Sequence, residues 1–256
     1  MTKHPETNGN FGLELNSGDL HYRAYVGPPS EYDLIAAISF GLVTTLGLRQ
    51  HHRLLDIGCG SLRIGRLLIS YLNSGNYIGI EPNEWLVREG IEKEIGHDLV
   101  RIKSPRFIFA AEPVVLTSEQ AFDFVLAQSI FSHCTLELME RWLKAIFPIL
   151  NQDGALVATF KAGEEDCFHQ KGINPEDFKG DGWIYPKCPT YRIQTIEELA
   201  LKVGYRFQLL DWGHPRQTWA LFAGKEFDTS WFARKPLSWT TRLESLKPRA
   251  GGADKT

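Results

Sequence analysis

Two short segments of this chain place acidic residues where a nucleotide-like ligand can be held. Leu54–Ser61 reads LLDIGCGS, an apolar strand that passes through Asp56 into a glycine turn, and Tyr77–Asn83 reads YIGIEPN. Glycine turns tightly and lets a ligand approach the backbone, and ligands of open parallel sheets bind outside the carboxyl ends of the strands. Glu81, the acid of the second segment, then lies where a ribose hydroxyl pair can be accepted. Together the segments predict a cofactor site of the nucleotide-binding kind.

A nicotinamide or flavin dehydrogenase is the main competing interpretation, because it also has a strand, a glycine turn and an acid about 20 residues further on. Its turn reads Gly-x-Gly-x-x-Gly, and the third glycine lets the helix pack closely with its amino end facing a pyrophosphate. Here Gly58 and Gly60 are followed by Arg63 at the third position. A larger residue is tolerable there if the ligand has no pyrophosphate, which favours another cofactor.

The motif resembles that of the class I S-adenosylmethionine (SAM) dependent methyltransferases. In that family an acid-x-Gly-x-Gly sequence follows the first strand and an acid ends the second, and the matching positions here are Asp56, Gly58, Gly60 and Glu81. Many members carry a further glycine where this chain has Leu62. The resemblance implies SAM as the cofactor, with the ribose on Glu81 and the adenine just past the third strand.

The resemblance also implies which residues hold the cofactor and what chemistry follows. The expected cofactor-binding residues are Asp56, Gly58, Cys59, Gly60, Glu81, Pro82, Ala111, Glu112, Gln128 and Ser129. No metal is expected, because a sulfonium donor is already activated and the enzyme mainly has to position an electron-rich atom beside the methyl carbon. A base is needed if the acceptor is a hydroxyl or an ammonium, since its proton must leave before the lone pair attacks.

His133 is the first candidate for that base. It ends the sequence SIFSH after the fourth expected strand, where the resembled family places residues that touch both SAM and substrate, and imidazole titrates in the useful range. The competing interpretation is that it merely begins the next helix. His214 and Arg216 lie in the turn after the sixth strand, whose carboxyl end is expected at the same edge of the sheet. We expect His133 to act as general base, and Arg216 with His214 to orient an acceptor that carries a negative or strongly polar group.

Other polar and aromatic side chains could line the same cleft, although packing among themselves explains them equally well. The next candidates for catalysis are Asp166 and His169 in the long segment 161–194. Residues of that segment that could wall a pocket are Trp183, Tyr185 and Tyr191, with Arg192 nearby. A cluster ahead of the sheet, from which Tyr22 or Arg23 could reach the cofactor carboxylate, comprises His21, Tyr22, Arg23 and Tyr25.

Hydrophobic periodicity predicts apolar strands that alternate with amphipathic helices, the pattern of a parallel sheet covered by helices. Beyond the two motif segments, strands are expected at Arg106–Ala111, Phe122–Ala127, Ala155–Phe160, Phe207–Trp212 and Thr218–Gly224. Helices are expected from Ser30 to Gly47, from Ile64 to Leu72, from a cap at Asn83 to about Gly96, from Glu137 to about Leu150 with a bend or end near Pro148, and from a capping box at Thr195 and Glu198 to Gly204.

The closing pair of strands is similar to the methyltransferase sheet, whose last-formed strand is antiparallel. The resemblance covers about residues 53–225 and implies an α/β fold, a Rossmann-like seven-stranded sheet of order 3-2-1-4-5-7-6 with strand 7 antiparallel and helices on both faces. We expect an N-terminal cap and helix (1–50), a SAM-binding domain (51–225) with a lid-like insertion (161–194), and a C-terminal tail (226–256).

The composition of the chain indicates which kinds of binding partner to expect. A net charge of −3 without an interior block of lysine and arginine argues against nucleic acid. The four cysteines form no CxxC pair, so neither a zinc site nor a disulfide framework is indicated, in keeping with a reducing cytoplasm. No apolar run approaches the roughly 18 residues that cross a bilayer, so no membrane association and a cytoplasmic location are expected.

The sequence therefore predicts a SAM-dependent methyltransferase acting on oxygen or nitrogen of a small-molecule acceptor. The chain reads AQSIF after the fourth strand, so it lacks the Asn-Pro-Pro-aromatic signature of the amino-methylating DNA enzymes. The magnesium-dependent catechol type has an acid near this point, and Gln128 and Ser129 cannot supply its charge. A protein of the same fold that binds SAM without turnover, as a sensor or partner subunit, is the alternative. The motif residues serve both functions, and the sequence does not indicate the acceptor or the oligomeric state.

Overall fold

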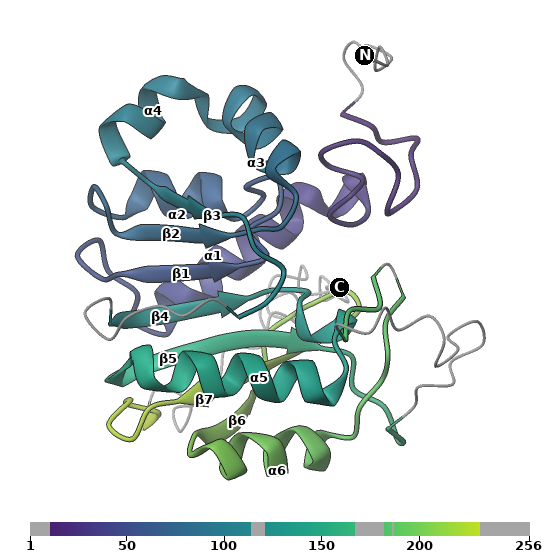
Figure 1. Cartoon of the computed structure of the whole chain (residues 1–256), viewed down its shortest axis with the longest axis vertical. Coiled ribbons are helices and arrows are strands. Elements are labelled where there is room, and N and C mark those ends of the chain that lie inside the picture. The colour runs from purple at the N-terminus through teal and green to yellow at the C-terminus, as the bar shows by residue number, and fades with distance from the viewer. Residues whose placement is uncertain (1–10, 114–120, 167–181, 186, 231–256) are drawn as a thin grey trace, which may run out of the picture.

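Seven strands form one mixed sheet in the order β3-β2-β1-β4-β5-β7-β6 (Figure 1). The computed structural model describes residues 11–113, 121–166, 182–185 and 187–230. The strands are β1 (Leu54–Ile57), β2 (Tyr77–Ile80), β3 (Arg106–Ile108), β4 (Phe122–Ala127), β5 (Leu150–Phe160), β6 (Arg206–Leu210) and β7 (Thr218–Ala223). Pairing is parallel from β3 through β5, whereas β7 is antiparallel to both β5 and β6. The predicted strand order and the antiparallel seventh strand are confirmed.

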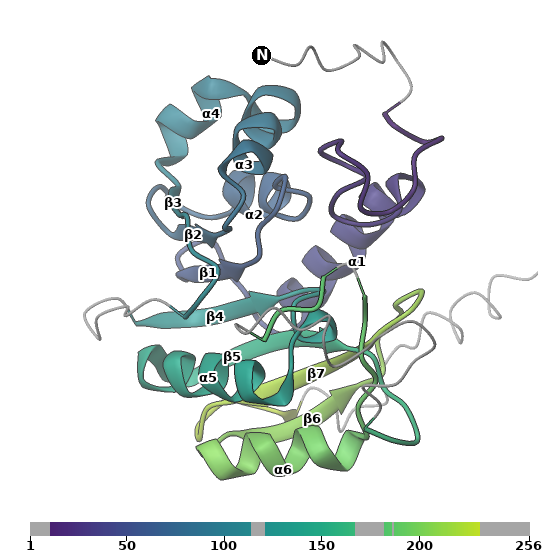
Figure 2. The same ribbon diagram turned by 45° about the vertical axis from the view of Figure 1, so that its right-hand side comes forward.

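Helices cover both faces of the sheet (Figures 1 and 2). On one face lie α1 (Tyr32–Thr45), α2 (Gly65–Tyr71) and α3 (Glu84–Gly90), and on the other lie α5 (Leu136–Ile146) and α6 (Ile193–Val203). Successive side chains of a strand point to opposite faces, so each inner strand contributes to both hydrophobic cores. This explains why the strands read as continuous apolar runs without alternation.

The helix that follows β2 is longer and less regular than predicted. It was expected to end near Gly96, but α3 continues through a π-helical turn, η2 (Ile91–Ile95), into α4 (Gly96–Lys103). The carboxylate of Glu94 lies in this turn, only 5 % exposed, and pairs with Arg23 and Arg66. Helical periodicity alone does not reveal a π turn, because the interaction that accompanies it is tertiary.

Two predicted helix caps are wrong. The helix expected from Ser30 begins at Tyr32, after the 3-10 turn η1 (Pro29–Glu31), and no side chain caps its first turn. Thr195 does not open a capping box, since α6 already begins at Ile193 and the Thr195 hydroxyl donates to Asp166 Oδ2 at 2.7 Å. Thr195 is the third residue of α6 and Arg192 holds the N-cap position, so the Thr195 hydroxyl lies too far along the helix to cap its start.

Strand and helix ends elsewhere shift by a few residues. β3 stops at Ile108, short of the predicted Ala111, and β5 starts at Leu150, ahead of the predicted Ala155. α5 ends at Ile146, and a 3-10 turn containing Pro148 follows, which confirms the predicted end near that proline. Asn83 holds the N-cap position of α3, but its side chain makes no cap hydrogen bond. No helix in the described part of the chain is long and apolar enough to span a bilayer.

The N-terminal segment is fixed beside the carboxyl edge of the sheet. Arg23 Nη2 lies 2.7 Å from Glu94 Oε1, and Arg66 Nη1 lies 3.0 Å from Glu94 Oε2. Tyr32 Oη donates to the Ser61 carbonyl at 3.0 Å, so the start of α1 is tied to the segment after β1. Figure 1 shows the N-terminal segment, in purple, at the edge where the parallel strands end. This edge is therefore flanked on one side by residues that precede the sheet in sequence.

A pair of glycine substitutions tests the close packing of α3 on the segment after β1. A Cβ at Gly90 would overlap the backbone carbonyl of Ser61, whereas a Cβ at Gly41, in α1, would lie 3.4 Å from Trp212. Gly90→Ala is expected to lower the free energy of unfolding by about 1–3 kcal/mol, the usual cost of overpacking. Gly41→Ala is the control and is expected to be neutral or stabilising by about 0.5–1 kcal/mol. Urea denaturation measures both, and equal stability of the two variants would contradict this packing.

Candidate active site

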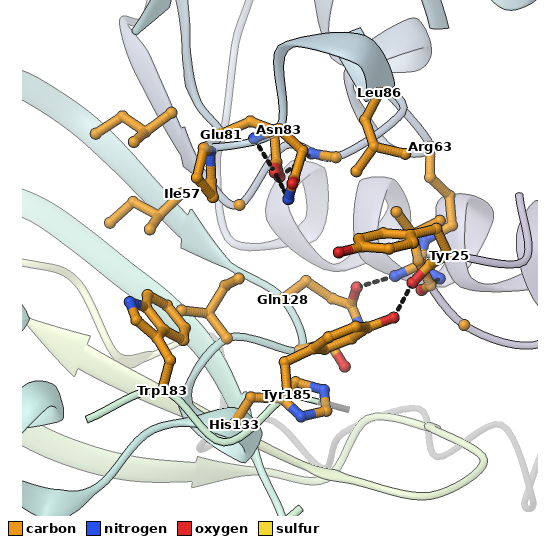
Figure 3. A pocket seen from close by; sticks show the side chains of 18 of the residues that line it. Tyr25, Ile57, Arg63, Glu81, Asn83, Leu86, Gln128, His133, Trp183 and Tyr185 are labelled. Carbon is orange, nitrogen blue, oxygen red and sulfur yellow. Dashed lines mark hydrogen bonds between the residues drawn. The ribbon is translucent and has the colours of Figure 1, made fainter. Parts of the chain in front are cut away.

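A cavity of about 460 Å³ opens at the carboxyl edge of the parallel strands. Residues at or just beyond the ends of β1, β2, β3 and β4 line it, together with part of the N-terminal segment. Figure 3 shows Glu81 and Asn83 on one side of the cavity and His133, Trp183 and Tyr185 on the opposite side. Its volume lies in the usual range for small-molecule sites.

The glycine turn after β1 folds back against the end of β2. Gly58 and Gly60 have φ of 69° and 54°, in the left-handed region that favours glycine. A Cβ at Gly58 would also overlap the side chain of Ile130, so this position lacks the space as well as the freedom for a larger residue. The amides of Gly58 and Cys59 both donate to Ile80 O, at 2.7 and 3.0 Å. The turn thereby closes one end of the cavity with backbone alone.

The segment after this turn retains a strained residue. Leu62 has φ of 61° and is fully buried. Positive φ is uncommon for a residue with a side chain and costs of order 1–3 kcal/mol. Burial of the leucine side chain in the core on the α1–α3 face offsets this strain.

Glu81 is held rigidly at the cavity wall. Its carboxylate accepts hydrogen bonds from Gly60 N at 3.1 Å, Asn83 N at 2.8 Å and Asn83 Nδ2 at 2.8 Å. Burial raises the pKa of this carboxyl, while the three donors act in the opposite direction. A carboxylate has about four acceptor positions, so Glu81 can also accept hydrogen bonds from a ligand.

Arg63 is a buried cation. In the sequence it was noted only because it stands where a dinucleotide-binding turn has its third glycine. Its Nη1 donates to Val26 O at 2.8 Å and its Nη2 donates to Gln128 Oε1 (Figure 3). Burial lowers the pKa of this guanidinium to about 10. No carboxylate of the described residues lies within ion-pair distance of it, and a buried charge with only neutral partners is costly. A ligand anion would offset this cost. The signal that could have revealed Arg63 in the sequence is an arginine just after a glycine turn.

His133 has the geometry of a neutral base. Its Nδ1 faces Lys187 O at 2.7 Å and therefore carries the proton, which leaves a lone pair on Nε2. Burial lowers its pKa below the usual value of 6.5, despite the bond to the carbonyl. The imidazole lines the cavity and packs on Tyr185 with 5.1 Å between ring centroids. It does not begin the next helix, because Thr135 caps α5 by accepting from Leu138 N.

His214 and Arg216 have different environments although they share one turn. His214 Nδ1 accepts from Arg216 N at 3.1 Å and Gln217 N at 2.9 Å, and its Nε2 lies 3.3 Å from Gln128 Nε2. Burial first, and then Arg216 and Arg63, lower its pKa to about 4, so it is neutral near pH 7. His214 does not line the cavity, whereas Arg216 does and pairs with Glu31. His214 thus supports the turn, and Arg216 faces the cavity.

Aromatic side chains bridge the cavity from two distant parts of the chain. Tyr185 Oη donates to Tyr25 O, and the two rings lie 5.4 Å apart between centroids. Trp183 Nε1 donates to Ala111 O at 3.0 Å, beyond the end of β3. Trp183 and Tyr185 belong to the segment predicted to be a lid, 161–194, of which 167–181 and 186 lie outside the described residues.

The structure brings most of the expected cofactor residues to this cavity. Those that line it are Gly58, Gly60, Glu81, Pro82, Ala111, Gln128 and Ser129. Asp56 and Cys59 line a separate void of about 20 Å³ beneath the turn, where Asp56 accepts from Tyr77 Oη at 2.7 Å and burial raises its pKa to about 7. The Glu112 carboxylate pairs with Arg141, away from the cavity.

Several weaker candidates lie elsewhere. Tyr22 and Arg23 do not reach the cavity, because both bind Glu94. Asp166 binds Arg192 and Thr195, and its expected partner His169 lies outside the described residues. Tyr191 is fully buried in the core, where its hydroxyl donates to Cys134 O. Trp142, Cys188 and Gln217 are among the residues that line the cavity but were not predicted from the sequence.

Comparison with known proteins agrees with this fold. Residues 55–156 match the model of a family described as a methyltransferase domain. Magnesium protoporphyrin IX methyltransferase from Synechocystis, with bound SAH, superimposes with a TM-score of 0.54 at 14% identity, over 77% of this chain and 84% of that one. A putative O-methyltransferase from Nostoc punctiforme gives 0.57 at 14% identity, over 78% and 59%. A SAM-dependent methyltransferase from Leishmania major gives 0.54 at 16% identity, over 76% and 73%.

The fold and this match point to the same class of protein. The chain has the fold of the class I, SAM-dependent methyltransferases, and residues 55–156 match a methyltransferase domain. Its sheet has the strand order and the antiparallel seventh strand of that class, and the matched residues run from β1 into β5, so they include the glycine turn and Glu81.

The protonation of His133 can be measured directly. Nitrogen-detected NMR of the imidazole is expected to show a neutral ring protonated at Nδ1, with a pKa below 6.5. Because burial disfavours the cation, the ring should stay neutral from neutral pH down through pH 6.5 and charge only in more acidic solution. His51, which is exposed, provides the comparison within the same spectrum. An Nε2-protonated ring, or a pKa above 6.5, would contradict the geometry described.

Proposed function

We propose that this protein transfers the methyl group of SAM to an oxygen or nitrogen atom of a small-molecule acceptor. One observation carries the proposal. A single cavity is lined by the glycine turn and Glu81 on one side and by His133, as a neutral base, on the other. A cofactor and an acceptor bound in that cavity would place the reacting atoms between these two sets of residues.

The described residues offer a partner for each part of the cofactor. Glu81 accepts from the ribose hydroxyls, and the methionine end lies over the glycine turn, where the missing side chains leave room for it. The buried cation of Arg63 lies beside this turn and suits the methionine carboxylate, because it has only neutral partners among the described residues. Ala111 and Ile130 line the cavity beyond β3 and β4, where the adenine fits an apolar wall.

His133 supplies the acid–base part of the reaction. The acceptor atom forms a bond to the methyl carbon as the carbon–sulfur bond breaks, and the electron pair of that bond remains on sulfur to give S-adenosylhomocysteine (SAH). The proton of a hydroxyl or ammonium acceptor passes to Nε2 of His133, because Nδ1 is already protonated toward Lys187 O. The cation formed on the ring is stabilised by that carbonyl.

Formation of SAH separates this proposal from binding without turnover. Purified protein is incubated with SAM and a mixed panel of hydroxyl and amine acceptors, and SAH is quantified against protein without acceptor. Acceptor-dependent SAH supports the enzyme. If calorimetry shows that SAM binds but no acceptor yields SAH, a sensor or partner subunit of the same fold becomes the better description.

Glu81→Ala is expected to weaken SAM binding by about 1.5–3 kcal/mol, because charge-assisted hydrogen bonds to the ribose are lost. Glu84→Ala is the matched control, since Glu84 is exposed and pairs only with Arg88 on the surface of α3. Calorimetric titration measures both affinities, and thermal unfolding checks that the turn remains folded. Unchanged affinity in Glu81→Ala would show that the ribose binds elsewhere.

His133→Ala is expected to lower kcat by about 100-fold while leaving SAM affinity nearly unchanged. Because burial lowers the pKa of His133, the wild-type rate should be level at neutral pH and fall only as pH drops below 6.5. The variant should lose this acid limb. His52→Ala, at the amino end of β1, is the control. Full activity in both variants would remove His133 from catalysis.

A further inference from the structure

We propose that the acceptor carries a carboxylate, that Arg216 binds this group, and that Glu31 occupies the same guanidinium when no acceptor is present. The inference rests on the proposed function for the acceptor and extends it to the chemical class of that acceptor. Four features of the described residues support it: the fixed position of Arg216, the unused donors of its guanidinium, the positive charge around it, and the carboxylate already bound to it.

The turn that carries Arg216 is fastened to the end of β4. Gln217 Nε2 donates to Ser129 Oγ at 2.7 Å. Within the turn, His214 Nδ1 accepts from Arg216 N at 3.1 Å. The guanidinium is therefore presented from a rigid support to the cavity that His133 also lines. A side chain on such a support loses little entropy when it binds a ligand.

The guanidinium of Arg216 has donors to spare. An arginine carries five N–H groups in a planar fork that matches a carboxylate. Among the described residues, its side chain makes one hydrogen bond, from Nη1 to Glu31 Oε2. The rest of the fork is available for a ligand, and the Arg216 side chain is 44% exposed at the cavity mouth.

Positive charge dominates this side of the cavity. Lys161, just after β5, forms no ion pair with any of the described carboxylates, and neither does Arg63. Arg216 and Cys188 both line the cavity, and Lys161 and Arg216 both act to lower the pKa of the Cys188 thiol, which burial raises. Glu81 is the only carboxylate among the described lining residues, and it lies across the cavity from His133. Cations grouped in a cleft attract anionic ligands.

Glu31 shows that this arginine accepts a carboxylate. Its side chain, 25% exposed, comes from η1 in the N-terminal segment and reaches Arg216 across the mouth of the cavity. Glu31 itself does not line the cavity. An acceptor carboxylate bound in the cavity would contact the Arg216 guanidinium from the cavity side. It would then compete with Glu31 for the ion pair with Arg216. Glu31 is then an internal competitor, and removing it should tighten binding of the acceptor.

If the Glu31–Arg216 ion pair has only a structural role, the expected effect of Glu31→Gln on ligand binding is reversed. If the contact only holds the N-terminal segment closed over the cavity, Glu31→Gln and Arg216→Gln remove the same bond and should change ligand binding in the same direction. If Arg216 binds the acceptor, the two substitutions should act in opposite directions. This difference in sign makes the pair a sharper test than either variant alone.

The test uses the full chain loaded with SAH and two probes of the same shape, benzoate and its neutral counterpart benzamide. Calorimetry is expected to show benzoate binding about tenfold or more tighter than benzamide, as for a charge-assisted hydrogen bond. Arg216→Gln should abolish that preference, Arg216→Lys should keep part of it, and Glu31→Gln should tighten benzoate several-fold without changing benzamide. Thermal unfolding of each variant confirms that it is folded.

The inference is overturned if wild-type protein binds benzoate no more tightly than benzamide, or if Glu31→Gln and Arg216→Gln both weaken benzoate. Other outcomes would distinguish a failure of the proposed function from a failure of the carboxylate site. If SAH and benzoate bind as described but no acceptor, charged or neutral, yields SAH from SAM, the carboxylate site stands and the catalytic assignment falls. If neutral acceptors are methylated and Arg216→Gln leaves their KM unchanged while benzoate shows no preference, the enzyme stands and the carboxylate site falls.

Discussion

The hydrogen bonds between the glycine turn after β1 and the end of β2 constrain the rest of the site. Two amides of the turn donate to Ile80 O and a third, from Gly60, donates to the Glu81 carboxylate. These bonds fix the backbone over which a cofactor can lie and, at the same time, the acid that faces it. The turn must adopt left-handed φ at Gly58 and Gly60, so it depends on residues without a Cβ.

A second constraint comes from the N-terminal segment, which flanks the cavity although it precedes the sheet. The Glu94 carboxylate, held in a π-helical turn, pairs with Arg23 and Arg66 and so anchors this segment. Removing one partner from a buried ion pair is more costly than the net stability the pair contributes. The segment is therefore part of the folded domain, and its Tyr25 and Val26 carbonyls complete the cavity by accepting from Tyr185 and Arg63.

Charge is distributed unevenly around the cavity. The carboxylate of Glu81 accepts three hydrogen bonds from the protein and has room for a ligand donor. Arg63 and Arg216 have more N–H donors than the described acceptors use. His133 and His214 are both kept neutral by burial, so the positive potential comes from arginines that do not titrate near neutral pH. A site of this kind suits ligands that bring their own negative charge.

The sequence was enough to predict the sheet and the meeting of the glycine turn with Glu81. Gly58, Gly60 and Glu81 directly follow the ends of two adjacent parallel strands, so the motif that predicts them also places them together. The tertiary structure alone decided the rest, because its contacts join residues far apart in the chain: Arg63 with Gln128 over 65 positions, and Arg216 with Glu31 over 185. Hydrophobic periodicity records which face of an element is buried. It does not record which polar side chains meet across the cavity, since that depends on how the turns after β4 and β6 and the N-terminal segment converge.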